Sequence, residues 1–204
     1  MSRILILYPD GSYMFRSYFD MPFEPDDILA EFDCSLVRLF LEMPKSNATL
    51  DRLSDLKSRL EDCFSYVSLD NDKARRSFLI APILSELIFY THIRLRVDYS
   101  IEVSDRLKGS LDYFFDGTRK LVVVAVQKAD LSRGFMQMAL QLIALYLWMD
   151  SDEPILMGAV STGDIWQFGQ FDRETKQITQ DLNSYRISAD LESLLRILVA
   201  IINS

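Results

Sequence analysis

The chain has 204 residues, of which 49% are hydrophobic and 25% charged, and its formal net charge is −8. This length suits one domain or a domain with a small extension, and the composition is that of a folded globular protein. The acidic balance argues against indiscriminate nucleic-acid binding, because such binding needs many Lys and Arg side chains to neutralise phosphates.

The sequence carries no pattern typical of a zinc site, a secretion signal or a membrane span. Its two cysteines, Cys34 and Cys63, form no CxxC pair, and the only histidine is His92. The start lacks a long apolar core and a small-residue cleavage site. The most apolar helical stretch, residues 135–149, is too short and too polar to span a bilayer. We therefore expect a cytoplasmic protein with free thiols and no membrane partner.

Residues 1–45 predict a small N-terminal extension made of a β-hairpin and a helix. Two strand-like runs, 3–8 and 13–18, flank a Pro-Asp-Gly turn. Two aspartates at 26 and 27 then favour a helix over 28–41. We expect the aromatic side chains of this extension to pack on the core or on a second protomer: Tyr13, Phe15, Tyr18, Phe19 and Phe23.

Residues 46–204 predict one α/β core domain. Leucines at helical spacing indicate a helix over 50–64, and a second helical stretch over 73–91 contains Pro82, which kinks it or marks its start. Alternating and β-branched runs then indicate strands at 94–103, 111–115 and 120–127. An Asp-Gly hairpin turn joins the second of these strands to the third.

The remainder of the chain continues the alternation of helices and strands. A helix is expected over 131–149 and a last one over 190–202. Strands are expected between them at 155–161, at 165–171 and shortly before 187. This order predicts a mixed sheet, antiparallel at one side and crossed over by a helix, with helices on its faces.

One strand pair has part of the residue pattern of a metal-dependent phosphodiesterase site. Asp112 lies on the strand before the apolar run at 122–124, and that run ends in Gln127 and Lys128. A hydrolase of this kind holds a divalent metal such as Mg²⁺ with carboxylates, and a nearby lysine neutralises charge. Residues two apart in a strand share a face, so a carboxylate and a lysine at that spacing point into one cleft.

On these residues the chain resembles the PD-(D/E)XK, or restriction-endonuclease-like, nuclease superfamily, in a bacterial branch. The family pattern is a helix with a glutamate, an aspartate on a hairpin strand, E-x-K on the next strand, and a further helix. Here the pattern falls on Glu86 in SELIF, on Asp112 in GSLDYFF, and on Gln141 in the following helix, with Gln137 one turn before it. The resemblance implies a restriction-endonuclease-like α/β fold with a mixed central sheet flanked by helices.

The chain departs from the family pattern at E-x-K, where it has Ala125-Val126-Gln127. A methyl group replaces a metal-binding carboxylate, and a neutral amide replaces the lysine. Lys128 follows directly, but in a regular strand it points to the opposite face, and only a bulge would turn it inward. The resemblance therefore implies a remnant site, made of Glu86, Asp112, Gln127 and Lys128, with no cofactor.

Three functions stay open on the sequence. The first is a catalytically degenerate nuclease-like protein that acts as a binding or regulatory module. A homodimer is one form that such a module could take. The second is an active Mg²⁺-dependent deoxyribonuclease that uses Asp112, Glu86 and a displaced Lys128, with Asp112 and Glu86 as metal ligands. The third is a protein-interaction module without a nucleic-acid role. A local basic groove would favour nucleic acid, and around Asp112 it would be built from Arg75, Arg76 or Lys128. Further candidates are Arg94, Arg96, Arg119 and Lys120.

Overall fold

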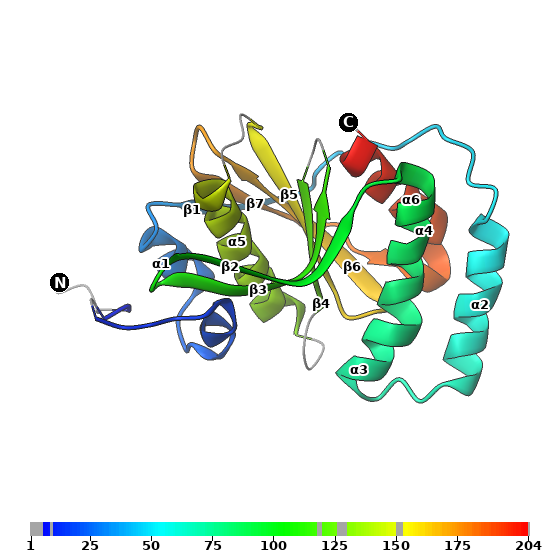
Figure 1. Ribbon diagram of the computed structural model, residues 1–204, viewed down its shortest axis with the longest axis horizontal. Helices are drawn as coiled ribbons and strands as arrows, with labels where there is room; N and C mark the ends of the chain where they lie inside the picture. The colour runs from blue at the N-terminus through cyan, green and yellow to red at the C-terminus, as the bar shows by residue number, and fades with distance from the viewer. Residues whose placement is uncertain (1–5, 9, 118–119, 126–129, 150–152, 204) are drawn as a thin grey trace.

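The structure is a computed structural model that describes residues 6–8, 10–117, 120–125, 130–149 and 153–203. Within these residues, eight strands form one mixed sheet in the order β1-β7-β6-β5-β4-β3-β2, and β8 pairs with β6 (Figure 1). The strands are β1 (Ser35–Leu39), β2 (Leu95–Ser104), β3 (Leu107–Asp116), β4 (Lys120–Ala125), β5 (Ile155–Ser161), β6 (Ile165–Asp172), β7 (Gln177–Asp181) and β8 (Tyr185–Arg186).

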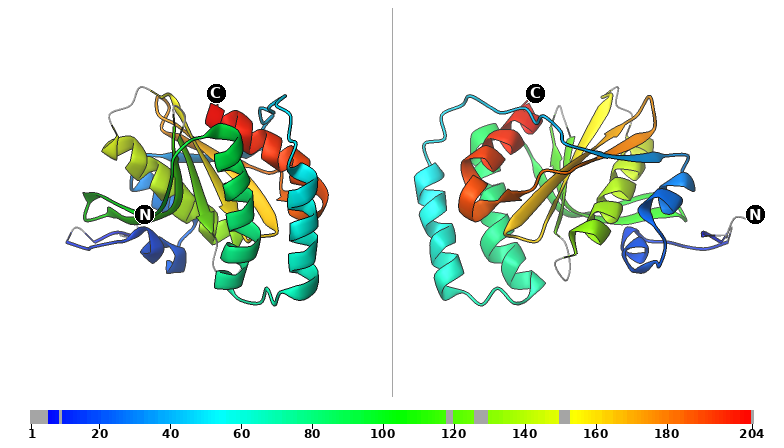
Figure 2. Two further views of the ribbon diagram at one scale, coloured as in Figure 1. Left: turned by 45° about the vertical axis from the view of Figure 1, so that its right-hand side comes forward. Right: turned by 180° about the vertical axis from the view of Figure 1, so that it is seen from behind.

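Helices lie on both faces of this sheet, which confirms the predicted α/β class (Figures 1 and 2). One face is covered by α5, with η1 and α1 beside it. The other face is covered by α4 and α6, and α2 lies outside them. The bounds are η1 (Phe15–Asp20), α1 (Pro25–Ala30), α2 (Leu53–Tyr66), α3 (Asp72–Arg75), η2 (Arg76–Ile80), α4 (Ala81–Thr91), α5 (Leu131–Trp148) and α6 (Ile187–Asn203).

The central part of the sheet has the predicted order of antiparallel hairpins and one helical crossover. Strand β3 pairs antiparallel with both β2 and β4, and β4 pairs parallel with β5. A parallel neighbour requires a crossover connection, and α5 provides it. This helix packs closely on the sheet, because a Cβ built on Gly169 would lie 2.5 Å from Cε2 of Phe135.

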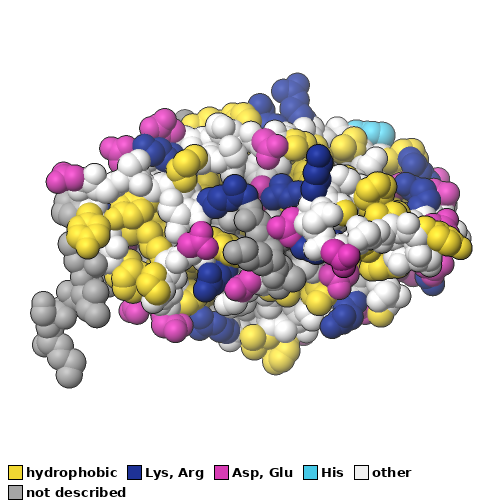
Figure 3. Space-filling view, turned by 90° about the horizontal axis from the view of Figure 1, so that it is seen from below, with side chains coloured by type: hydrophobic (Ala, Val, Ile, Leu, Met, Phe, Trp, Pro, Cys, Tyr) yellow, Lys and Arg dark blue, Asp and Glu magenta, His cyan; other side chains and the backbone are white. Residues whose placement is uncertain are grey.

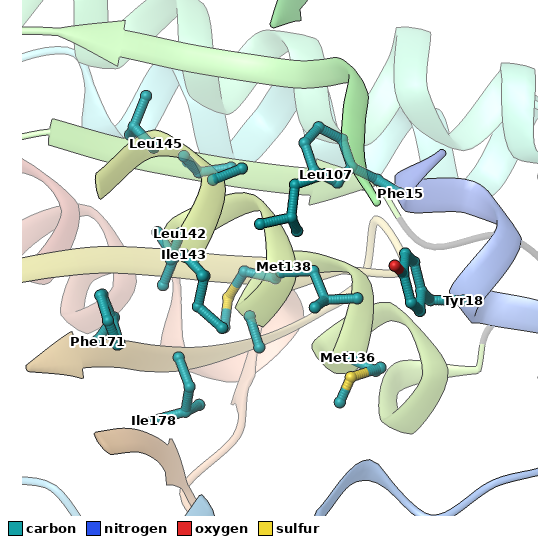
Figure 4. Packing of buried hydrophobic residues seen from close by; sticks show 14 of the residues in the cluster. Phe15, Tyr18, Leu107, Met136, Met138, Leu142, Ile143, Leu145, Phe171 and Ile178 are labelled. Atoms are coloured by element: carbon teal, nitrogen blue, oxygen red, sulfur yellow. The ribbon is translucent and has the colours of Figure 1, made fainter. Parts of the chain in front are cut away.

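The predicted N-terminal hairpin is wrong in the described residues. Residues 13–18 were expected to form a strand, but Phe15–Asp20 is the 3₁₀ helix η1, and residues 6–8 are not in a strand. The aromatic residues at 13–18 suggested a strand, but they are there because η1 packs on the core. Phe15 and Tyr18 are both buried, each with 1% exposure, against the α5 side of the sheet (Figure 4). These aromatics therefore pack within the chain.

The helix expected over 28–41 is also wrong beyond its first turns. Helix α1 ends at Ala30, and Asp33 has a positive φ of 55° that redirects the chain. Residues 35–39 then form β1, which pairs parallel with β7 at the edge of the sheet. A short amphipathic run is compatible with a helix or a strand. Here residues 35–39 form a strand because they pair with the otherwise unpaired edge of β7.

The long helical stretch before β2 is confirmed, with an irregularity in the middle. Residues 72–91 form α3, the π-helical segment η2 and α4 in succession, and Pro82 lies in the first turn of α4. The first residue of η2 is Arg76, whose carbonyl accepts a hydrogen bond from the N–H of Ala81. This wider turn removes the need for a bond to the missing N–H of Pro82. His92, with φ of 54°, ends α4 in the left-handed conformation.

Two apolar clusters, one on each face of the sheet, form the core. The α5 cluster includes Met138, Leu142 and Phe171, and it extends to Phe15 and Tyr18 of η1 (Figure 4). The other cluster joins α2, α4 and α6 to the opposite face around Trp166 and Phe168. Both cysteines are free thiols, as predicted. Among the described residues, no helix is long and apolar enough to cross a membrane.

Candidate functional site

A cavity of about 460 Å³ opens where η1, the α3–η2 junction and the strands β2, β3 and β4 meet. Asp112 on β3 and Ala125 at the end of β4 both line it. The other described residues that line it come from the surrounding elements: Met14, Phe15, Arg16, Asp72, Lys73, Arg76, Asp98, Gly109, Ser110 and Gln137.

Each oxygen of the Asp112 carboxylate accepts a hydrogen bond from a protein group. Its Oδ1 accepts a hydrogen bond from Nη2 of Arg76 at 3.0 Å, and its Oδ2 accepts one from the backbone N–H of Ala125 at 3.0 Å. The side chain is only 14% exposed. Burial raises the pKa of Asp112 above its ordinary value, and the cation of Arg76 and the Ala125 N–H oppose that rise.

Arg76 joins the two strands of the site. Besides Asp112, its Nη2 donates to the backbone carbonyl of Ala125 at 3.1 Å. The residue reaches the cavity from the first position of η2, and its side chain is 28% exposed. A single guanidinium group therefore binds a carboxylate of β3 and a carbonyl of β4.

Ala125 is buried at the end of β4, where the family pattern would place a glutamate. Its exposure is 4%, so no carboxylate enters the cavity from this position. The pairing of Tyr113 with Val123 places Asp112 beside the last residues of β4, which confirms the predicted β3–β4 hairpin. Gln127 and Lys128 lie outside the described residues.

Glu86 is not among the residues that line this cavity. It lies on α4, ten residues after Arg76, which corresponds to about 15 Å along a helix axis. Its carboxylate is 1% exposed and accepts hydrogen bonds from Arg52 at 3.1 Å and from Arg59 at 2.7 Å. Glu86 thus fastens α2 to α4, and the predicted pairing of Glu86 with Asp112 in one metal site does not form.

The two glutamines of α5 occupy different environments. Gln137 lines the cavity. Gln141 is fully buried and donates from Nε2 to the backbone carbonyl of Ser110 on β3, at 3.2 Å. Its Oε1 has no hydrogen-bond partner among the described residues. Gln141 therefore ties the crossover helix to the strand that carries Asp112.

Asp98 is a cavity residue that sequence reasoning missed. It lies on β2 with a positive φ of 49°, and its carboxylate contributes to the raised pKa of Asp112. A non-glycine residue with positive φ inside a strand is uncommon and concentrates at functional sites. In the sequence Asp98 is one aspartate in an alternating strand, and no pattern signals its backbone conformation.

The candidates for a basic groove lie in different places. Among those whose side chains the structure describes, Arg76 lines the cavity, together with Arg16 and Lys73. Arg75 instead binds Asp72 and the carbonyl of Leu69, and Arg96 binds Asp116. Arg119 and the side chain of Lys120 lie outside the described residues.

The charges of the described cavity lining balance. Three basic residues, Arg16, Lys73 and Arg76, stand against three aspartates. In Figure 1, η1, α3 and the end of β4 lie at the lower end of the molecule. The view from below shows basic and acidic side chains interspersed on that face (Figure 3).

The described residues of the site do not fit a divalent metal. Among them, no group of three or more His, Cys, Asp or Glu side chains is arranged to hold a metal ion. Magnesium and similar cations need several oxygen ligands, but both oxygens of Asp112 already accept hydrogen bonds, the Ala125 side chain offers only a methyl group, and the Ala125 carbonyl accepts a hydrogen bond from Arg76.

Comparison with known proteins assigns no family. No family model matches the chain, and a search of curated proteins found no match.

Proposed function

We propose that this protein is a catalytically degenerate PD-(D/E)XK nuclease-like protein that works by binding rather than by hydrolysis. The observation that carries the proposal is the state of Asp112. This carboxylate lies in a cavity at the β3–β4 hairpin, yet both its oxygens accept hydrogen bonds within the protein. Ala125 stands at the position where the family pattern has a second, metal-binding carboxylate.

The order of elements supports the proposal. A helix (α4) precedes three antiparallel strands (β2, β3, β4), and α5 then crosses over to the parallel strand β5. Asp112 falls on a hairpin strand and Gln141 on the helix that follows, which are the elements on which the resemblance places them. Glu86 does not line the cavity, so its position does not support the proposal.

The balance of charge favours a protein partner over a nucleic acid. A nucleic-acid site gains affinity by neutralising several phosphates, and the described lining of the cavity, with equal numbers of acidic and basic residues, offers little net attraction. The net charge of −8 acts in the same direction at longer range. A binding or regulatory module for another protein, including a second copy of this chain, is therefore the preferred form of the proposal.

The decisive experiment measures metal-dependent cleavage. Wild type and Asp112→Ala are incubated with supercoiled plasmid and with single-stranded DNA, each with Mg²⁺ or Mn²⁺. We expect no cleavage above the level of the Asp112→Ala variant. Cleavage that depends on Asp112 would overturn the proposal and restore the active deoxyribonuclease as the better explanation.

A second experiment separates the two kinds of partner. Binding of a fluorescent DNA duplex is followed by anisotropy at 50 and 200 mM salt, with Lys73→Ala as the variant and Lys57→Ala, on the outer helix α2, as the control. We expect weak binding that neither substitution changes. Strong, salt-sensitive binding that Lys73→Ala weakens selectively would instead assign a nucleic-acid partner. Light scattering of the purified protein tests for a homodimer.

A further inference from the structure

Arg76 bridges the two strands of the cavity through a single nitrogen atom. Its Nη2 lies 3.0 Å from Oδ1 of Asp112 and 3.1 Å from the carbonyl oxygen of Ala125. A carboxylate oxygen and a backbone carbonyl oxygen are the ligand types that Mg²⁺ and Ca²⁺ use in proteins. A positively charged side chain therefore binds the same kind of oxygen pair that a cation would bind.

We infer that the Arg76 guanidinium is a built-in cation that takes the place of a divalent metal at Asp112 and closes the cavity to metal ions. The inference rests on the proposed function and deepens it. It states that the site is closed by an added cation as well as by a lost carboxylate.

The backbone conformation at Arg76 is a second observation in favour of this role. Arg76 is the first residue of the π-helical segment η2, where the helix widens between α3 and α4. Such segments are rare and often occur at functional sites. The segment presents Arg76 to the cavity, while its neighbour Arg75 turns to Asp72 and the Leu69 carbonyl. Adjacent arginines are thus assigned to different partners.

Geometry explains why the guanidinium excludes a metal. Mg²⁺ binds oxygen at about 2.1 Å. An ion at that distance from both Oδ1 of Asp112 and the Ala125 carbonyl, on the side of Arg76, would overlap Nη2, and like charges would repel. The second oxygen of Asp112 already accepts a hydrogen bond from the Ala125 N–H.

The other charged groups of the described cavity lining offset one another. Asp72 and Asp98 face the cavity with Asp112, and Arg16 and Lys73 offset them. Arg76 is the residue bonded to Asp112, so its removal leaves a buried carboxylate with an uncompensated charge. A restored second carboxylate should then create a site that favours a dication.

The test compares Mn²⁺ binding by calorimetry in four proteins. These are wild type, Ala125→Glu, Ala125→Glu/Arg76→Met, and the last with Asp112→Asn added. We expect no binding to wild type, and at least tenfold tighter binding to Ala125→Glu/Arg76→Met than to Ala125→Glu. Addition of Asp112→Asn should abolish the gain. Circular dichroism checks that each variant is folded, and Arg76→Gln replaces Arg76→Met if the latter unfolds.

The outcomes separate the inference from the proposed function. Equal Mn²⁺ affinity with and without Arg76 would overturn the inference and leave the degenerate site intact. Asp112-dependent Mn²⁺ binding to wild type would overturn both. Failure of the folded Ala125→Glu/Arg76→Met protein to bind Mn²⁺ would also overturn the inference.

A measurement on the otherwise native protein keeps the inference testable if the Arg76 variants do not fold. Nitrogen NMR of arginine side chains reports rotation about the guanidinium bonds. We expect slow rotation for Arg76 in wild type and fast rotation in Asp112→Asn. Fast rotation of Arg76 in wild type would overturn the inference.

Discussion

Removal of Arg76 should expose the cost of burying Asp112. In Arg76→Met, the Asp112 carboxylate loses its cation while the side chain stays largely buried. The two charge centres are separated by about 4 Å, which gives about 4 kcal/mol of attraction at an effective dielectric constant of 20. Part of this is offset by the dehydration of Arg76, so we expect a loss of about 2 kcal/mol in the free energy of unfolding at pH 7.

The loss should depend on pH in a direction that burial dictates. The pKa of Asp112 is already raised in the folded state, mainly by burial, and Arg76 lowers it. The folded state therefore holds the proton more tightly than the unfolded state, and stability falls as the pH rises from the ordinary aspartate pKa through the raised one. Arg76→Met raises that pKa further, so its destabilisation should be smaller at pH 4.5 than at pH 7.

Urea denaturation of a double-mutant cycle measures the effect. Arg76→Met is compared in the wild-type and Asp112→Asn backgrounds at both pH values, and we expect the loss to shrink and its pH dependence to vanish with Asp112→Asn. Arg96→Met is the matched control, because it removes a similar ion pair, with Asp116 at 2.9 Å, away from the cavity. An equal loss for Arg76→Met in both backgrounds would refute the reasoning.

Three further predictions concern residues outside the ion pair. Glu86→Gln should lower the free energy of unfolding by about 1–2 kcal/mol in urea denaturation, because it weakens the hydrogen bonds from Arg52 and Arg59. The same substitution should leave the Mn²⁺ affinity of Ala125→Glu/Arg76→Met unchanged. A changed affinity would show that Glu86 belongs to the site. Gly169→Ala should lower stability by about 1–3 kcal/mol in the same assay, since the new Cβ meets the ring of Phe135 at 2.5 Å, and a neutral effect would show that α5 can move away. Burial raises the pKa of Cys34 to about 11, so iodoacetamide at pH 8 should modify the half-buried Cys63 before Cys34. Peptide mass spectrometry measures the two rates, and equal rates would contradict the burial of Cys34.

The core elements could be predicted from the sequence because their patterns are long and local. The β-branched run at 122–124 and the Asp-Gly turn define the β3–β4 hairpin, and the apolar stretch of α5 defines the crossover. The N-terminal part could not be predicted, because the conformation of residues 35–39 depends on β7, which lies far away in the sequence. Long-range pairing of this kind overrides local propensity.

The candidate site divides in the same way. Asp112 and Ala125 could be predicted from their place in the hairpin. Arg76 was a candidate only for a basic groove, because its role depends on a helix irregularity that no local pattern signals. Glu86 was assigned from its helix alone, but the face of α4 on which it lies is set by the packing of α2, whose two arginines bind it.

The pairing of β1 with β7 has a consequence for how the chain is assembled during synthesis. Asp181, the last residue of β7, adds a further bond between the two segments. Its carboxylate accepts a hydrogen bond from the N–H of Leu41, 140 residues away in the sequence. Strand β1 therefore leaves the ribosome long before its partner exists, and closure of such a long loop is slow. Until β7 is made, the N-terminal strand has unpaired backbone groups that another chain could bind. Stalled or C-terminally shortened chains should consequently be far more prone to aggregate than the finished protein.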